Sequence, residues 1–208
     1  MREYNTLFWD FDGVVKESVE VKAKAYIELF ESFGEVISSR VRNHHERNGG
    51  MSRFEKIPLY LEWSGQAPSE MLVGEYCSRF SMLVTDRVIN AAWVPGVEEY
   101  LKCNLWRQRF ILVSATPDEE LQWILVQLGL LKCFSMIYGA SVSKRDAIGY
   151  SINQFNLDPT ECLMIGDAQS DFQAALANGV PFLLRRHATN VSEFKDYDGP
   201  SITDFASI

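Results

Sequence analysis

The sequence predicts an α/β protein, with a parallel sheet as its core and a block of helices inserted after the first strand. Short apolar runs alternate with stretches of helical period, which is typical of strand–helix units in a parallel sheet. One interval between strands is also far longer than a single crossover helix needs. The predicted strands are residues 7–11, 110–114, 136–139, 162–166 and 181–184.

The long interval covers residues 16–92, which follow the first strand and are too helical for a loop. A glycine pair at 49–50 interrupts its helical pattern, and residues 94–97 (Val-Pro-Gly-Val) mark the return to the core. We therefore expect a core of residues 1–15 and 93–208 and a helical domain of residues 16–92. The first inserted helix should end at Gly34 and bury one apolar face, made of Val19, Ala23, Tyr26, Ile27, Phe30 and Phe33.

Two helices of the core have predicted ends. After the second strand, residues 116–119 (Thr-Pro-Asp-Glu) predict an N-cap at Thr116, a proline in the first turn and a capping box, and Gly129 should end the helix. After the fourth strand, Ser170 is the predicted N-cap of a helix that ends near Gly179.

Composition excludes several classes of protein. The 208 residues include 20 Lys and Arg against 28 Asp and Glu, and a net charge of −8 disfavours binding to nucleic acid. The four cysteines are widely spaced, without a C-x-x-C pair, so neither a disulfide framework nor a zinc site is predicted. The first ten residues do not resemble a signal peptide, and no apolar run approaches the ~20 residues of a membrane span. We expect a cytoplasmic protein without membrane partners, either a monomer or a weak homodimer.

Polar side chains gather where the predicted strands end. Ligands of open parallel sheets bind outside the carboxyl ends of the strands, so we expect these side chains to share one crevice. Neighbouring carboxylates repel each other unless a cation lies between them, and donors that are all oxygen favour Mg²⁺ over zinc. The residues are Asp10 and Asp12 after the first strand, Ser114 and Thr116 after the second, Lys144 after the third, and Asp167 and Asp171 after the fourth.

These residues carry a resemblance to the haloacid dehalogenase superfamily. Residues 10–15 (Asp-Phe-Asp-Gly-Val-Val) resemble its first motif, Ser114 its second, Lys144 its third and residues 166–171 its fourth, in the family's order. The resemblance covers essentially the whole chain. It implies a Rossmann-like parallel sheet core with an inserted all-helical cap domain, as in phosphoglycolate phosphatases and β-phosphoglucomutases.

The resemblance also implies a role for each motif residue. Asp10 would attack phosphorus and become an aspartyl phosphate, and Asp12 would protonate the leaving oxygen and then deprotonate water. The carboxylates of Asp10 and Asp167, with the main-chain carbonyl of Asp12, would hold Mg²⁺.

Three further positions would bind or orient the phosphoryl group. Ser114, with Ala115 beside it, and Lys144 would bind the transferring oxygens, while Asp171 would orient Lys144 or a metal-bound water. This agrees with phosphoryl transfer, in which catalysis depends mainly on positioning and charge neutralisation.

The second aspartate, Asp12, favours phosphate esters over halide or phosphonate substrates. Residues 50–53 (Gly-Met-Ser-Arg) resemble the specificity loop of the helical cap, so Arg53 is expected to bind a distal anionic group of the substrate. The mutase branch has a histidine where this chain has Lys22. We therefore expect a Mg²⁺-dependent phosphatase of a small sugar phosphate or phosphoglycolate-like acid. The alternatives are a β-phosphoglucomutase-type sugar phosphomutase and an inactive regulatory or binding protein of the same fold.

Three other polar residues have simpler expected roles. Thr116 is expected only to cap its helix. His44 and His45 are adjacent on a predicted helix and so point in different directions, which disfavours a shared metal ion. We expect them to lie on the surface or to pack within the cap.

Overall fold

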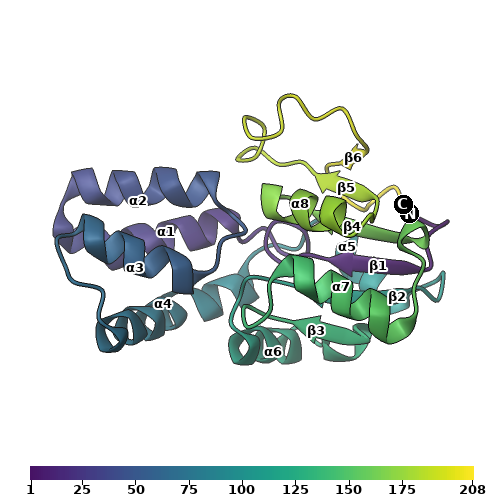
Figure 1. Ribbon diagram of the computed structural model, residues 1–208, viewed down its shortest axis with the longest axis horizontal. Coiled ribbons are helices and arrows are strands. Elements are labelled where there is room, and N and C mark those ends of the chain that lie inside the picture. Colours follow the sequence, from purple (N-terminus) through teal and green to yellow (C-terminus); the bar gives the residue numbers. More distant parts are fainter.

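The computed structural model describes residues 1–208 as a six-stranded parallel sheet with a group of helices at one end (Figure 1). The strand order is β3-β2-β1-β4-β5-β6, and every neighbouring pair is parallel. This confirms the predicted α/β class and all five predicted strands. The strands are β1 (Thr6–Trp9), β2 (Arg109–Val113), β3 (Met136–Tyr138), β4 (Cys162–Gly166), β5 (Phe182–Arg185) and β6 (Ser201–Ile202).

Helices cover both faces of the sheet because side chains alternate along each strand. Leu7 and Trp9 of β1 belong to the apolar cluster that includes α5 (Val97–Cys103) and α6 (Asp118–Gln127). Phe8 belongs to the cluster on the opposite face, with α7 (Lys144–Phe155) and α8 (Gln169–Ala177). The central strands are therefore buried on both sides, which explains their unbroken apolar sequences.

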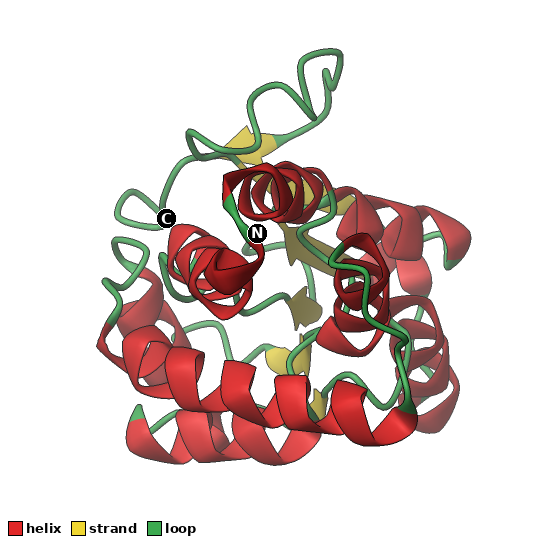
Figure 2. Cartoon of the chain, turned by 90° about the vertical axis from the view of Figure 1, so that its left-hand side faces the viewer, coloured by secondary structure: helices red, strands yellow, loops and turns green.

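The inserted region forms four long helices, which lie at the left of Figure 1 and face the viewer in Figure 2. They are α1 (Val19–Phe30), α2 (Glu35–Arg47), α3 (Arg53–Trp63) and α4 (Glu70–Asn90). Of the predicted apolar face of α1, Ala23, Tyr26 and Phe30 are buried, whereas the other three side chains are half-buried. The apolar cluster on one face of the sheet also includes Tyr60 and Phe80 of these helices, so the two parts share one core.

The predicted helix starts in the core are wrong, by one residue for α6 and by two residues for α8. Helix α6 begins at Asp118, and the Thr116 hydroxyl contacts Asp12 in place of the helix backbone. Helix α8 begins at Gln169, and Ser170 lies inside its first turn with no hydrogen bond from its hydroxyl. In both cases a contact with a distant residue or the path of the preceding strand overrides the local capping pattern.

The predicted helix ends are confirmed. Gly129 and Gly179 follow α6 and α8 with φ of 68°, a left-handed conformation that glycine adopts without strain. No helix in the structure combines the length and the apolar character that a membrane span requires.

Candidate active site

Three aspartates converge at the carboxyl edge of the central strands. Asp10 follows β1, Asp167 follows β4 and Asp171 lies in the first turn of α8, and all three are buried. One ligand atom from each lies within 4.8 Å of the others, a grouping that could hold a metal ion. Strands β1 and β4 are neighbours in the sheet, which is why residues more than 150 positions apart meet there.

Lys144 joins two of these carboxylates. Its Nζ lies 2.9 Å from Oδ2 of Asp10 and 2.7 Å from Oδ1 of Asp171. Burial alone would lower the pKa of Lys144, but the two carboxylates outweigh it and raise that pKa, so the side chain is a fixed cation. Burial and the charge of Asp171 raise the pKa of Asp10 to about 7 even with Lys144 beside it. A further cation at the site would favour the ionised form of Asp10.

Asp12 is turned toward the inserted helices. Its carboxylate accepts hydrogen bonds from the Ser18 hydroxyl at 2.6 Å and the Thr116 hydroxyl at 3.3 Å, and it pairs with Lys22 of α1. Burial acts to raise the pKa of Asp12, but Lys22 and Ser18 together hold it below its usual range. The side chain of Asp12 is thus separate from the three clustered carboxylates, while its main chain stays next to Asp10.

The backbone between these aspartates depends on Gly13. This residue has φ of +76°, and a Cβ placed there would lie 2.2 Å from Oδ2 of Asp167. Only glycine fits this position, so the sequence Asp-x-Asp-Gly reflects a steric requirement of the site as well as a turn.

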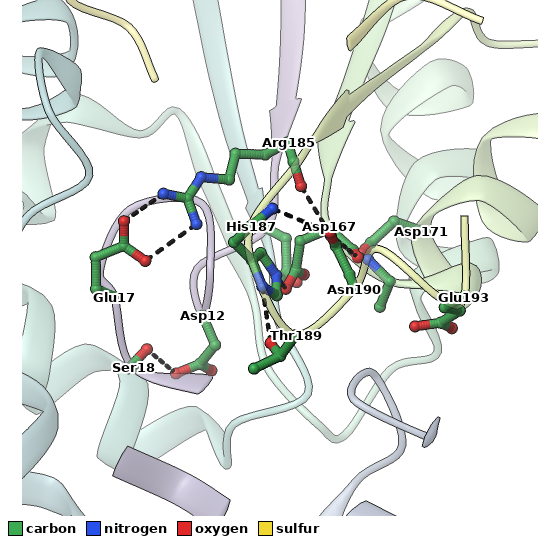
Figure 3. Close-up of polar contacts among 12 residues, drawn as sticks. Asp12, Glu17, Ser18, Asp167, Asp171, Arg185, His187, Thr189, Asn190 and Glu193 are labelled. Atoms are coloured by element: carbon green, nitrogen blue, oxygen red, sulfur yellow. Dashed lines mark hydrogen bonds and ion pairs between the residues drawn. The ribbon is translucent and has the colours of Figure 1, made fainter. Parts of the chain in front are cut away.

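A loop after β5 completes the surroundings of Asp167 (Figure 3). Nε2 of His187 lies 2.8 Å from Oδ2 of Asp167, and Nδ1 of His187 lies 2.8 Å from the Thr189 hydroxyl. The Asn190 side chain donates to the main-chain oxygens of Asp167 and Arg185, each at 2.9 Å. Burial raises the pKa of Asp167, and the hydrogen bond with His187 opposes this. These contacts fix both the carboxylate and the backbone of Asp167.

The sequence offered no signal for this loop. His187 and Asn190 lie beyond the last predicted strand and form no motif with Asp167, which is 20 residues before His187. The same figure shows Arg185 of β5 bound to Glu17. This contact connects the segment after β1 to a strand two positions away in the sheet.

Ser114 and Ala115 follow β2 at the same edge of the sheet. The Ser114 hydroxyl accepts a hydrogen bond from the amide of Thr116 at 3.2 Å, and the side chain is buried. Ala115 and Lys144 line a small cavity beside Asp10, and they also line a larger groove of about 790 Å³ between the α2–α3 loop and the core. The second predicted motif is therefore at the site, and an open passage leads to it.

The small cavity lies between the inserted helices and the core and measures about 40 Å³. Arg53 lines it, as predicted for a substrate contact, but its guanidinium pairs with Glu120 of α6 at 2.6 and 2.8 Å and also contacts Ser81. The helices contribute Val19, Lys22, Tyr26, His45, Gly49, Gly50, Met51, Arg53, Lys56 and Phe80; the core contributes Asp10, Asp12, Ala115, Lys144 and Asp167.

The two adjacent histidines do point in different directions. His44 packs within the helical region, with Nδ1 at 3.0 Å from the hydroxyl of Tyr60. His45 is buried against Lys56, as a packing role predicts, but it also lines the cavity beside Asp10.

The fold and the buried carboxylates define a class, an α/β protein with helices inserted over an acidic site at the carboxyl edge of its parallel sheet. A family model described as haloacid dehalogenase-like hydrolase matches residues 4–179. The chain belongs to the haloacid dehalogenase-like hydrolases.

Two curated relatives support this assignment. A phosphorylated carbohydrates phosphatase of Thermotoga maritima is 27% identical over 185 residues, which are 84% of this chain and 81% of that protein. A phosphoglycolate phosphatase of Colwellia psychrerythraea is 22% identical over 212 residues, covering 96% and 92% of the two chains.

Solved structures agree on the fold. A predicted phosphoglycolate phosphatase of Haemophilus somnus superposes with a TM-score of 0.77 at 18% identity, over 98% of this chain and 96% of the other. A β-phosphoglucomutase of Clostridium difficile has the same TM-score at 20% identity, over 99% and 93% of the two chains. Phosphatases and mutases thus share this architecture, and the fold alone does not separate them.

Proposed function

We propose that this protein is a Mg²⁺-dependent phosphatase that hydrolyses a small phosphorylated metabolite through an aspartyl-phosphate intermediate on Asp10. The observation that carries the proposal is the placement of Asp10, buried beside Lys144 and within ligand distance of Asp167 and Asp171. A nucleophilic carboxylate needs a cation to accept the charge of the phosphoryl oxygens, and this edge of the sheet offers both.

The donor set fits a hard cation such as Mg²⁺. The clustered groups are all carboxylates, with no cysteine and no histidine among them. As the family resemblance implies, Asp10, Asp167 and the main-chain carbonyl of Asp12 would hold the ion, while Asp171 binds Lys144 and the Ala168 amide. When bound, the ion neutralises the clustered carboxylates and polarises the phosphoryl oxygens.

In this mechanism Asp10 attacks phosphorus while Asp12 gives its proton to the departing oxygen of the ester. Asp12 then accepts a proton from the water that attacks the aspartyl phosphate, so the carboxyl group of Asp10 is released unchanged with inorganic phosphate. Ser114, Ala115 and Lys144 bind the phosphoryl oxygens, and Asp171 positions Lys144. Ser18 and Lys22 favour the ionised form of Asp12, which the second step uses, whereas the first step needs the protonated form.

The alternative is a sugar phosphomutase, which returns the phosphoryl group to a second hydroxyl of the substrate. Lys22 argues against it, since the mutase branch has a histidine at this position and this chain has a lysine that pairs with Asp12. A phosphatase releases inorganic phosphate, whereas a mutase isomerises its substrate and depends on a bisphosphate activator.

We further propose that residues 16–92 act as a cap domain over a core of residues 1–15 and 93–208. Arg53 could bind a distal anionic group of the substrate only in a state in which its pair with Glu120 is open. Opening of the cap would provide such a state.

The test is phosphate release from a panel of small sugar phosphates and phosphorylated acids, with and without Mg²⁺. Asp10→Asn should abolish release, whereas the matched variant Asp86→Asn, at an exposed position of α4, should behave as the native protein. Isomerisation without phosphate release would support the mutase instead, and no reaction from a folded native protein would support an inactive binding protein.

A further inference from the structure

Three cations of the inserted helices line the cavity beside Asp10, and two of them are already neutralised. Lys22 pairs with Asp12, and Arg53 pairs with Glu120. Lys56 of α3 forms no ion pair: its Nζ lies 3.0 Å from Nδ1 of His45 and 5.7 Å from the centre of the Tyr26 ring. Lys56 is therefore the cation of this cavity that has no counter-charge.

Because Lys56 is buried, the lack of a counter-charge makes its protonated form unfavourable. Its side chain is 1% exposed, and burial together with the charge of Lys22 lowers its pKa to about 7, although Asp12 and Glu55 act in the opposite direction. Buried amines are normally paired because an isolated charge destabilises the fold. An anion in the cavity would supply the partner and favour the protonated amine.

His45 of α2 offers a second donor at the same place. Burial, followed by the charge of Lys56, holds the pKa of His45 well below its usual range, so the ring is neutral. When Lys56 donates to Nδ1, the ring proton must be on Nε2. Nε2 is buried and no acceptor meets hydrogen-bond geometry, while a backbone contact with Val19 acts to raise the pKa of the ring and is outweighed. A buried N–H without an acceptor is rare in folded proteins and points to a missing ligand atom.

As a refinement that rests on the proposed function, we propose that Lys56 and His45 form a carboxylate-binding subsite and that the substrate is a short phosphorylated carboxylic acid. A carboxylate has one negative charge and two acceptor oxygens, which match one unpaired cation and one free N–H. A second phosphate would carry more charge than the subsite neutralises, and an uncharged sugar would leave Lys56 unpaired.

The size of the cavity supports a short substrate. It measures about 40 Å³, and one water needs ~10–15 Å³ by this measure, so only compact groups fit between Asp10 and Lys56. The carboxylate must then lie within a few bonds of the phosphate ester. Arg53, whose charge is satisfied by Glu120, forms part of the wall in this arrangement.

The test compares two substrates of equal length, 2-phosphoglycolate and 2-hydroxyethyl phosphate, which differ in the carboxylate. Lys56→Met should raise KM for 2-phosphoglycolate about 10- to 100-fold, as expected for a lost charged hydrogen bond, with kcat changed less than about threefold. Both constants for 2-hydroxyethyl phosphate should stay within about twofold, since that substrate makes no such bond. Lys24→Met, on the exposed face of α1, is the matched control.

Two results would overturn the subsite. One is an equal effect of Lys56→Met on both substrates; the other is a native enzyme that prefers glucose 1,6-bisphosphate or 2-hydroxyethyl phosphate to 2-phosphoglycolate. If Lys56→Met does not fold, Lys56→Gln removes the charge and keeps an N–H, and the same outcomes apply.

A binding measurement separates this inference from the proposed function. Millimolar glycolate should raise the melting temperature of the native protein and leave that of Lys56→Met unchanged. If neither the two substrates nor p-nitrophenyl phosphate is hydrolysed with Mg²⁺, the phosphatase proposal fails, but the glycolate measurement still decides whether the subsite exists. No shift in the native protein would overturn the subsite alone.

Discussion

The geometry of the active site depends on a single glycine, Gly13. Gly13 combines a left-handed backbone with a close approach to Asp167, whereas Gly65 has nearly the same φ, +75°, and open space around it. The two positions therefore separate backbone strain from steric exclusion. We expect Gly65→Ala to lower the free energy of unfolding by about 1–2 kcal/mol, the cost of the left-handed conformation.

Gly13→Ala should cost more than this, because its Cβ must also displace the Asp167 carboxylate. It should reduce phosphate release by at least about 100-fold, while Gly65→Ala leaves release intact. Denaturant unfolding and a phosphate assay measure the two effects. Full activity in Gly13→Ala would show that the position of Asp167 can shift without loss of function.

The pairing of Lys22 with Asp12 predicts how phosphate release depends on pH. It holds the pKa of Asp12 below its usual range, against the effect of burial, so Asp12 stays ionised at mildly acidic pH. If Asp12 is the base in the second step, phosphate release falls as the pH drops through its pKa. Lys22→Met removes the favourable charge and should move this fall to higher pH, whereas Lys24→Met should leave the profile unchanged. An unshifted profile in Lys22→Met would argue against Asp12 as the titrating base.

His187 is predicted to support the metal site through Asp167. Its Nε2 contacts the Asp167 carboxylate, and groups that orient a ligand in this way typically contribute 10- to 100-fold to metal affinity. His187→Ala should therefore raise the Mg²⁺ concentration for half-maximal activity about 10- to 100-fold, as a metal titration would show. Lys195→Ala, at an exposed position of the same loop, is the control. Equal Mg²⁺ requirements of the two variants would show that His187 does not contribute to the metal site.

At the scale of secondary-structure elements, the core was largely predictable from local sequence. Central strands are buried on both faces and so read as continuous apolar runs, and glycines mark the ends of α6 and α8. The two-residue strand β6 was missed because so short a segment has no period. The capping predictions at Thr116 and Ser170 failed because residues outside the helix determine where those chains turn.

The partners of site residues were less predictable than the motif residues themselves. Asp10, Ser114, Lys144 and Asp167 follow strands in order, so topology brings them to one edge. The pairing of Arg53 with Glu120 and of Lys56 with His45 depends on how the inserted helices dock, which no local pattern encodes.

The Arg53–Glu120 pair is the main charged link between helices α3 and α6. Both side chains are buried, at 3% and 8% exposure, so removing one partner leaves an unpaired buried charge. Either Arg53→Met or Glu120→Leu alone should destabilise the protein by about 3–5 kcal/mol, and the double variant should recover most of that loss. Thermal or denaturant unfolding of the four proteins forms a double-mutant cycle. Additive losses would mean that the pair contributes nothing to docking of the helices.

For the molecule as a whole, the small size of the cavity leads us to expect motion of the helical region. A cavity of about 40 Å³ has room for only a few waters, so we expect a phosphorylated metabolite to enter when the helices move away from the core. The α2–α3 loop is the place to test this, because it rests directly on the first turn of α8. A Cβ at Gly49 would lie 3.8 Å from Cβ of Ala168, about the mean separation across a disulfide.

The double variant Gly49→Cys with Ala168→Cys should therefore form a disulfide that holds the cap closed. We expect oxidation to reduce phosphate release by at least about 100-fold and a thiol reductant to restore it, because substrate cannot enter while the loop is tethered. Each single variant, in a background where the exposed Cys103 is serine, should be insensitive to oxidation. Mass spectrometry would verify the bond. A cross-linked protein as active as its reduced form would show that substrate reaches Asp10 without cap opening, and the open groove that leads to Ala115 and Lys144 would then be the route.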